Sequence, residues 1–347
     1  MAFAIVLRAA KRIRTLAATP IPFFGIGAMR AGTTWLSELL RSYPDCAMTS
    51  IKEIHFFDIR YGQFDSCKHY RSKAQRLEKL SEIVSKRVES ALEGFDAASS
   101  SGESGVEHEF SPEGRPVART NEFRAKFSKL ANIDDSLSEI SDILDYLLLL
   151  DNESYVRYMT RYSVGVRAFG EISPNYGLLP AAAFAEINSL FPAARYIFIM
   201  RDPVDRLWSH VRFKAGKAKR RDGRQRNLNE AFRRLLASPY AIEKSSYQST
   251  IDRLESVIPA DRILYLFYER MVSPKMGPRE VRRIESALGL DPVDIDPSIF
   301  TTTVNASTAA SLDRDNDAAA TKLFAPVYKF VQERFGTQPH WRMPEEL

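Results

Sequence analysis

A glycine-rich turn near the amino end of the chain has the composition of an anion-binding loop. The stretch from Gly25 to Thr34 reads GIGAMRAGTT and lies between an apolar run and a segment with helical apolar spacing. Glycines let a backbone approach an anion closely, the N–H groups of such a turn point at it, and the following helix N-terminus adds positive potential. The turn predicts a phosphate-binding loop, and a tight strand-to-helix connection without a ligand is the alternative.

The loop differs from the one that nucleoside triphosphatases use. In their frame, G-x-x-x-x-G-K-S/T, the lysine holds the β- and γ-phosphates. Gly27, Gly32 and Thr34 fit this frame, but Thr33 occupies the lysine position, and Arg30 supplies a cation instead. We therefore expect a loop that binds a phosphate group, but not a triphosphate with magnesium.

A second set of anion-binding residues follows a strand beyond the middle of the chain. Residues 194–200, ARYIFIM, form the clearest buried strand in the sequence, and Arg201 comes directly after them. The carboxyl ends of strands are where α/β sheets bind ligands. Ser209 lies eight positions later, roughly 800° around a helix at about 100° per residue, which places it on the same general face as Arg201. A guanidinium with a hydroxyl suits a second phosphate, and a solvated helix start is the alternative.

A carboxylate and an imidazole lie close together in the sequence after the loop. The segment at residues 52–58 reads KEIHFFD, and in an extended backbone Glu53, His55 and Phe57 would share one face. A glutamate beside a histidine near a phosphate loop suits proton transfer. The same pair also fits an ordinary structural role in the core or on the surface.

The apolar periodicity predicts the elements that position these segments. Strands are expected at residues 21–26, 47–50, 164–171, 194–200 and 263–267. Helices are expected at residues 33–40, 77–92, 133–150, 153–162, 182–191, 202–214, 228–236, 244–257, 279–288 and 319–335. Strands that alternate with helices favour an α/β fold with a P-loop-type parallel β-sheet, flanked by helices on both faces.

Length and composition bound the organisation of the chain. Its 347 residues are 44% hydrophobic and 27% charged, which is the balance of a globular protein. We expect a tail at residues 1–19 and a single α/β domain at residues 20–347. The low-complexity stretch AASSSGESG marks a long surface insertion at about residues 93–130, either a lid or a loop without a role.

Charge and hydropathy bear on partners and compartment. The net charge of +5 fits an anionic ligand and is too small to require nucleic acid. No membrane span is expected, because the apolar start of the chain is far shorter than the roughly 20 residues that a span needs. Cys46 and Cys67 are expected to be reduced thiols, with a single disulfide as the alternative. We therefore expect a cytoplasmic protein.

Together the three segments resemble the sulfotransferases that use 3′-phosphoadenosine 5′-phosphosulfate (PAPS). The family's 5′-phosphosulfate loop has the form K-x-G-T-S/T-W, and the corresponding residues here are Arg30, Ala31, Gly32, Thr33, Thr34 and Trp35. The family's 3′-phosphate motif is an arginine with a serine eight residues later, which Arg201 and Ser209 match. Residues 52–58 are similar to the Glu-x-His-Phe-Phe stretch of heparan sulfate and bacterial sulfotransferases, where the glutamate is the base.

The resemblance implies a reaction and a role for each residue. The reaction is in-line transfer of a sulfuryl group to a hydroxyl or amine, which leaves 3′-phosphoadenosine 5′-phosphate (PAP). Glu53 would take the acceptor proton, His55 would orient it, and Arg30 would neutralise the departing 5′-phosphate. Lys52 and Asp58 would contact the acceptor. The acceptor would be a glycan, a lipid or a small molecule.

Two positions depart from the family pattern. The loop cation is usually lysine, and arginine is a weaker proton donor because it stays charged. Related glycan enzymes have a Glu-Lys-Ser/Thr-Pro stretch, and here Ile172 replaces its lysine. Weaker similarities at residues 170–176, 266–269 and 304–307 extend the resemblance over about residues 20–310. Because Ile172 replaces this lysine, the resemblance to glycan enzymes is weaker evidence that the acceptor of this chain is a glycan.

Several alternatives stay open at this point. A P-loop nucleotide or small-molecule kinase lacks support from the loop, which has no lysine, and a non-catalytic nucleotide-binding module is disfavoured by the intact Glu53. No metal is expected, because the other histidines have no zinc-like spacing: His69, His108, His210 and His340. The basic stretch at residues 214–226 is either a wall of an acceptor cleft or a solvated helix end.

Overall fold

The computed structural model describes residues 19–63, 78, 82, 141, 144–224, 226–300 and 310–344. The predicted insertion at residues 93–130, the predicted helix at residues 77–92 apart from two positions, Cys67 and the similarity at residues 304–307 lie outside the described residues. The chain divides into two compact units, residues 1–65 with 151–347 and residues 66–150. The three predicted segments belong to the first unit.

Five parallel strands form one sheet, in the order β2-β3-β1-β4-β5. The central strand β1 (Ile21–Gly27) pairs with β3 (Ala168–Ile172) and β4 (Arg195–Met200), while β2 (Cys46–Met48) and β5 (Ile263–Phe267) form the edges. Helices cover both faces of the sheet, so most strand side chains are apolar, and the buried Glu171 of β3 is an exception. The sheet confirms the predicted α/β fold.

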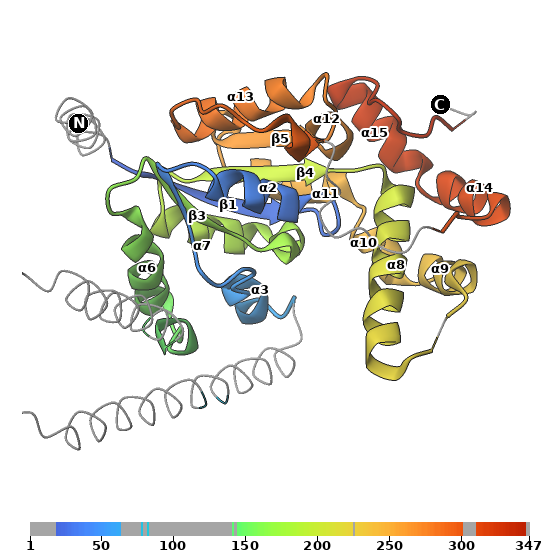
Figure 1. Ribbon diagram of the computed structural model, residues 1–347, viewed down its shortest axis with the longest axis horizontal. Coiled ribbons are helices and arrows are strands. Elements are labelled where there is room, and N and C mark those ends of the chain that lie inside the picture. Colours follow the sequence, from blue (N-terminus) through green and yellow to red (C-terminus); the bar gives the residue numbers. More distant parts are fainter. Residues whose placement is uncertain are drawn as a thin grey trace, which may run out of the picture. The chain divides into compact units, whose positions relative to one another are not determined.

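Helices cover both faces of the sheet (Figure 1). On one face, α2 (Thr33–Arg41) and α13 (Gly277–Leu288) are joined through the Tyr43 hydroxyl, which donates a 2.7 Å hydrogen bond to Glu285. On the other face, α7 (Ala181–Leu190) packs beside α11 (Tyr247–Glu255). In the part of the chain that the structure describes, no helix has the length and apolar character to cross a bilayer.

The other described helices of the first unit range from four to 20 residues in length. The remaining α-helices are α3 (Phe56–Arg60), α6 (Asn152–Thr160), α8 (Pro203–Asp222), α9 (Leu228–Leu236), α10 (Pro239–Glu243), α12 (Tyr268–Met271), α14 (Arg314–Leu323) and α15 (Ala325–Phe335). Four short 3-10 turns connect them, at Arg161–Ser163, Pro174–Leu178, Ala260–Arg262 and Pro297–Phe300.

Two predicted helices have different bounds in the structure. The single helix predicted at residues 319–335 is two helices, α14 and α15, which meet at Phe324. Pro326 lies in the first turn of α15, where its missing N–H does no harm, but it would break a continuous helix. The helix predicted to end at residue 214 continues as α8 to Asp222, since its lysines, arginines and alanines favour helix, and Gly223 ends it with a φ of 71°.

Candidate active site

The loop after β1 presents a helix N-terminus at the carboxyl edge of the sheet. β1 ends at Gly27 and α2 begins at Thr33. Gly32 precedes α2 with a φ of 96°, and a Cβ at this position would lie 2.6 Å from the Tyr268 ring. Both the backbone conformation and the lack of space therefore require glycine here. The first N–H groups of α2 have no carbonyl partner within the helix and are therefore suited to an anion.

Both predicted anion-binding sets come together at this edge. The Arg30 guanidinium donates from Nε and Nη2 to the Ser209 hydroxyl, over 3.3 and 3.2 Å. Nη1 of Arg201 donates to the Arg30 carbonyl over 3.2 Å. These contacts join residues 179 and 171 positions apart in the chain. One site therefore contains the cations and the hydroxyl that were predicted from two separate motifs.

Aromatic rings support both guanidinium groups. Cζ of Arg30 lies 4.4 Å from the centre of the Phe213 ring, and Cζ of Arg201 lies 4.3 Å from that of Tyr268. Stacking leaves the planar edge of a guanidinium directed at its oxygen partners. Burial, followed by the positive charges of Arg201 and Arg212, lowers the pKa of Arg30. A bound anion would relieve this repulsion.

Glu53, His55 and Asp58 form a chain of charged groups next to the loop. Nε2 of His55 lies 3.6 Å from Glu53 Oε2, and its Nδ1 lies 2.7 Å from Oδ2 of the buried Asp58. Burial alone lowers the pKa of His55, but its hydrogen bonds to Asp58 and Glu53 raise it to about 9. The imidazole therefore carries a positive charge at neutral pH.

The charge on His55 keeps Glu53 ionised. Burial alone raises the pKa of Glu53, but the hydrogen bond and charge of His55, with the charges of Lys52 and Lys217, hold it below its ordinary value. Glu53 is also close enough to Arg30 for their charges to interact. The ionised carboxylate of Glu53, which can accept a proton, therefore lies near the Arg30 guanidinium of the loop.

The backbone that carries these groups does not have the extended conformation in which Glu53, His55 and Phe57 would share one face. Glu53 and His55 have φ values of 59° and 58°, in the left-handed region, and α3 begins directly afterwards. Helical turning from Phe56 onward returns Asp58 to His55, three residues before it, which an extended chain could not do. The Phe57 side chain lies in the core, stacked edge-on against Tyr155 and Tyr176.

The remaining predicted residues lie at the loop or behind it. Nζ of Lys52 donates a 2.7 Å hydrogen bond to the Thr34 hydroxyl, which brings a second cation to the first turn of α2. Ala31 and Thr33 have buried side chains, so only their backbone groups face the loop. Trp35 is a core residue whose indole N–H donates to the Ile299 carbonyl over 2.8 Å.

A family model described as the sulfotransferase family matches residues 22–294 of the chain. The chain belongs to the sulfotransferase family. Comparison with curated protein sequences gives no significant match.

One solved structure agrees with this membership at the level of the fold, and a second is reported beside it. The sulfotransferase from Alicyclobacillus acidocaldarius is 19% identical with a TM-score of 0.51, over 94% of this chain and 98% of that one. The sulfotransferase domain of the Synechococcus PCC 7002 olefin synthase is also 19% identical, with a TM-score of 0.39, over 88% of this chain and 94% of that one. At 19% identity, the likeness to the Alicyclobacillus acidocaldarius sulfotransferase shows the fold alone.

The carboxyl-terminal residues of this sulfotransferase hold the turn that carries Arg201. Nη1 of Arg342 donates to Asp202 Oδ1 over 2.7 Å and to Asp205 Oδ1 over 2.9 Å. Asp202 is fully buried and caps α8, accepting from two N–H groups of its first turn. Glu269 accepts from the Asp202 N–H and from the Trp341 indole, and burial raises the pKa of Glu269 to about 7. No sequence motif marks Trp341 and Arg342, which supply the carboxyl-terminal half of this clamp.

The clamp should matter for stability. Removing one partner of a buried ion pair leaves the other charge uncompensated, at a cost of about 3–5 kcal/mol. Because Arg342 is partly exposed, we expect Arg342→Ala to lower the free energy of unfolding by about 3 kcal/mol, measured by urea denaturation. Arg334→Ala, which breaks an exposed pair with Glu255, should cost less than about 1 kcal/mol. Equal losses in the two variants would contradict the role given to Arg342.

The ion pairs of His55 predict a pH-dependent stability. The pKa of His55 is about 9 in the folded chain and 6.5 ordinarily. Its contribution to the free energy of unfolding is therefore fully present below pH 6.5 and is lost as the pH rises through 9. The shift corresponds to on the order of 3 kcal/mol. We therefore expect the difference in unfolding free energy between wild type and His55→Gln to shrink by that order between pH 6.5 and 9. A difference that stays constant over this range would contradict the charged state of His55.

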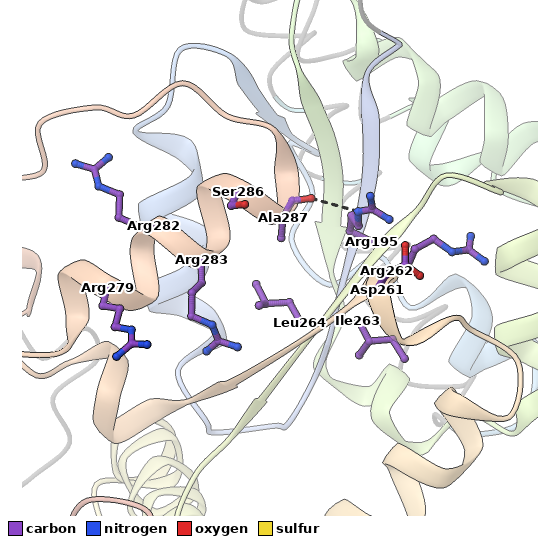
Figure 2. Close-up of a pocket in the computed structure, with 10 residues that line it drawn as sticks. All are labelled: Arg195, Asp261, Arg262, Ile263, Leu264, Arg279, Arg282, Arg283, Ser286 and Ala287. Carbon is purple, nitrogen blue, oxygen red and sulfur yellow. Dashed lines mark hydrogen bonds between the residues drawn. The ribbon is translucent and has the colours of Figure 1, made fainter.

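A separate cavity lies at the opposite edge of the sheet. It has a volume of about 390 Å³ and lies where β4 and β5 begin, beside α13. Figure 2 shows its side chains around Leu264, with Arg195 bonded to the Ala287 carbonyl. Five arginines line it, but Arg282 and Arg283 are paired with glutamates on α13. Since the loop and Arg201 lie at the carboxyl ends of β1 and β4, this cavity is not part of the candidate site.

Within the described residues, no cluster of side chains suits a metal ion.

Proposed function

We propose that this sulfotransferase transfers a sulfuryl group from PAPS to a hydroxyl or amine acceptor, with Glu53 as the base. The observation that carries the proposal is the junction of the two anion-binding sets, where Arg30 contacts Ser209 and Arg201 contacts the Arg30 carbonyl. A ligand with two anionic groups on one scaffold would use both sets at once. Membership of the sulfotransferase family supports a sulfuryl donor rather than a nucleoside triphosphate.

The residues at the site fit such a donor. Arg30, Lys52 and the first turn of α2 would hold the 5′-phosphosulfate, since they offer two cations and a helix N-terminus. Arg201 and Ser209 would hold the 3′-phosphate through a guanidinium and a hydroxyl. The mutual repulsion of Arg30, Arg201 and Arg212 favours a ligand of multiple negative charge. When bound, PAPS supplies an activated sulfuryl group.

Each residue of the proton-transfer chain has a separate task. The Glu53 carboxylate accepts the proton of the acceptor hydroxyl or amine, which it can do at neutral pH because its pKa lies below the ordinary value. His55, as an imidazolium, faces Glu53 and fixes its orientation, and the buried Asp58 fixes His55. Arg30 stays positively charged and stabilises the negative charge that develops on the leaving phosphate.

Ligand protection against thermal unfolding tests the proposed donor. PAP should stabilise the protein without magnesium, by about 2.7 kcal/mol at a hundredfold excess over its Kd, because it binds the folded state alone. ATP with magnesium should give no protection, since the loop lacks the lysine that holds a triphosphate. Protection by ATP with magnesium and none by PAP would overturn the proposal in favour of a kinase. If PAP protects the protein, incubation of labelled PAPS with the protein and cell extract would identify the sulfated product.

A further inference from the structure

A groove with basic and apolar walls runs between α8 and α9, which lie side by side in Figure 1. This α8–α9 groove has a volume of about 660 Å³, within the range of roughly 300–1,000 Å³ typical of small-molecule sites. Residues at i, i+4, i+7 and i+11 spacing form one stripe of α8 along it, at positions 210, 214, 217 and 221. Its cations are Lys214, Lys217, Arg221 and Arg226, and its apolar residues include Val211 and Leu235.

The charge of the groove is positive. Among the described residues that line it, four are cations and none is a carboxylate. Asp222, at the end of α8, pairs with Arg226 over 2.7 Å and with Arg221 over 3.6 Å, so it offsets part of the charge at that end only. The two lysines lie nearer to the loop, and their methylene stems add apolar surface below their charged ends.

One lining residue of the groove, Lys217, contacts the same aromatic ring as Arg30 of the loop. Nζ of Lys217 lies 5.0 Å from the centre of the Phe213 ring, and Cζ of Arg30 lies 4.4 Å from the centre of the same ring. Lys217 is also one of the cations that lower the pKa of Glu53. Lys217 therefore belongs both to the lining of the groove and to the charged surroundings of Glu53.

His210 marks the part of the groove where several positive charges lie near one another. His210 lines the groove directly after Ser209 on α8. Burial, followed by the charges of Lys214 and Arg206 and then of Arg30, lowers the pKa of His210 to about 3. The four cations that line the groove are exposed. A concave surface lined by charges of one sign concentrates their field, and an anion is the ligand that such a field attracts.

We propose that the α8–α9 groove binds the acceptor, and that the acceptor is an amphipathic anion. Such a molecule has an apolar chain or ring for Val211 and Leu235, and a carboxylate, phosphate or sulfate group for Lys214 and Lys217. Its hydroxyl or amine then lies at the Glu53 end of the groove. This inference rests on the proposed sulfuryl transfer, because it assigns the second substrate of that reaction.

A binding experiment tests the groove without the reaction. The probe is anilinonaphthalene sulfonate, a fluorescent amphipathic anion, titrated into wild type, a double variant (Lys214→Glu, Lys217→Glu) and a control (Lys219→Glu, Arg220→Glu). The control changes the same charge on the same helix at exposed residues that do not line the groove. We expect the Kd of the probe to rise at least about tenfold in the groove variant and less than about twofold in the control. Equal changes in both, or none in the groove variant, would overturn the inference.

A turnover experiment separates this inference from the proposed function. Consumption of PAPS is measured with hydroxyphenylpropionate and with its methyl amide, which has the same ring, hydroxyl and chain but a neutral amide in place of the carboxylate. We expect kcat/KM to be at least about tenfold higher for the carboxylate in wild type and the preference to vanish in the groove variant, whose binding of PAP should persist. Preference for the amide overturns the anionic acceptor and leaves the donor assignment intact. Failure to bind PAP overturns the proposed function, and the probe titration alone then decides the groove.

Discussion

Replacement of Glu53 by glutamine should lower turnover by about 10²–10⁴-fold, which is the usual contribution of a positioned base. Glutamine keeps the size of the side chain but cannot accept the proton. The affinity for PAP should stay close to that of wild type, because the groups that would hold the nucleotide are Arg30, Arg201 and Ser209. Steady-state turnover and calorimetric titration with PAP measure the two effects separately.

A matched control distinguishes the base from a general effect of lost charge. Glu153→Gln removes a carboxylate on α6 that is 88% exposed and lies 3.9 Å from Arg157. Its turnover and PAP affinity should equal those of wild type. If Glu53→Gln keeps turnover within a few-fold of wild type, another group accepts the proton and the assignment is wrong.

Replacement of Arg201 by alanine should weaken PAP much more than adenosine 5′-monophosphate, which lacks the 3′-phosphate. Hydrogen bonds to charged groups contribute about 1.5–3 kcal/mol, so the loss for PAP should be roughly 10- to 100-fold. The affinity for the monophosphate should fall only slightly, through the lost contact of Arg201 with the Arg30 carbonyl. Calorimetry with both nucleotides on both proteins gives the difference directly.

The control for this experiment is Arg157→Ala, since Arg157 is 67% exposed on α6 and pairs only weakly with Glu153. It should leave both affinities unchanged. Equal losses of PAP and the monophosphate in Arg201→Ala would show that Arg201 supports the loop as a whole. The 3′-phosphate would then have to be bound elsewhere.

Local patterns were sufficient to predict the sheet and the meeting of its two anion-binding sets. The strands are short and mainly apolar, although β3 contains Glu171, and β5 has the bounds that its sequence predicts. In a parallel α/β sheet the carboxyl ends of the strands share one edge, so residues after β1 and after β4 had to lie near one another. Arg30 and Arg201 were therefore predictable as neighbours even though 171 positions separate them.

The parts of the site that depend on long-range packing were not predictable. Nothing in the sequence around Phe213 indicates that its ring lies beneath Arg30, and Arg342 follows α15 without any motif that points to Asp202. Glu53 and His55 approach through two left-handed residues, a conformation that is uncommon for either type and that apolar periodicity does not detect. Helix α8 was predicted too short. Because it continues to Asp222, part of the basic stretch at residues 214–226 lies along the groove beside α9, which the sequence did not indicate.

A crystal structure of the complex with PAP measures the central relation most directly. The 5′-phosphate should lie at the start of α2 against Arg30, and the 3′-phosphate of the same molecule should contact Arg201 and Ser209. A nucleotide that touches only one of these two sets, or that occupies the arginine-lined cavity at the other edge of the sheet, would contradict a shared donor site.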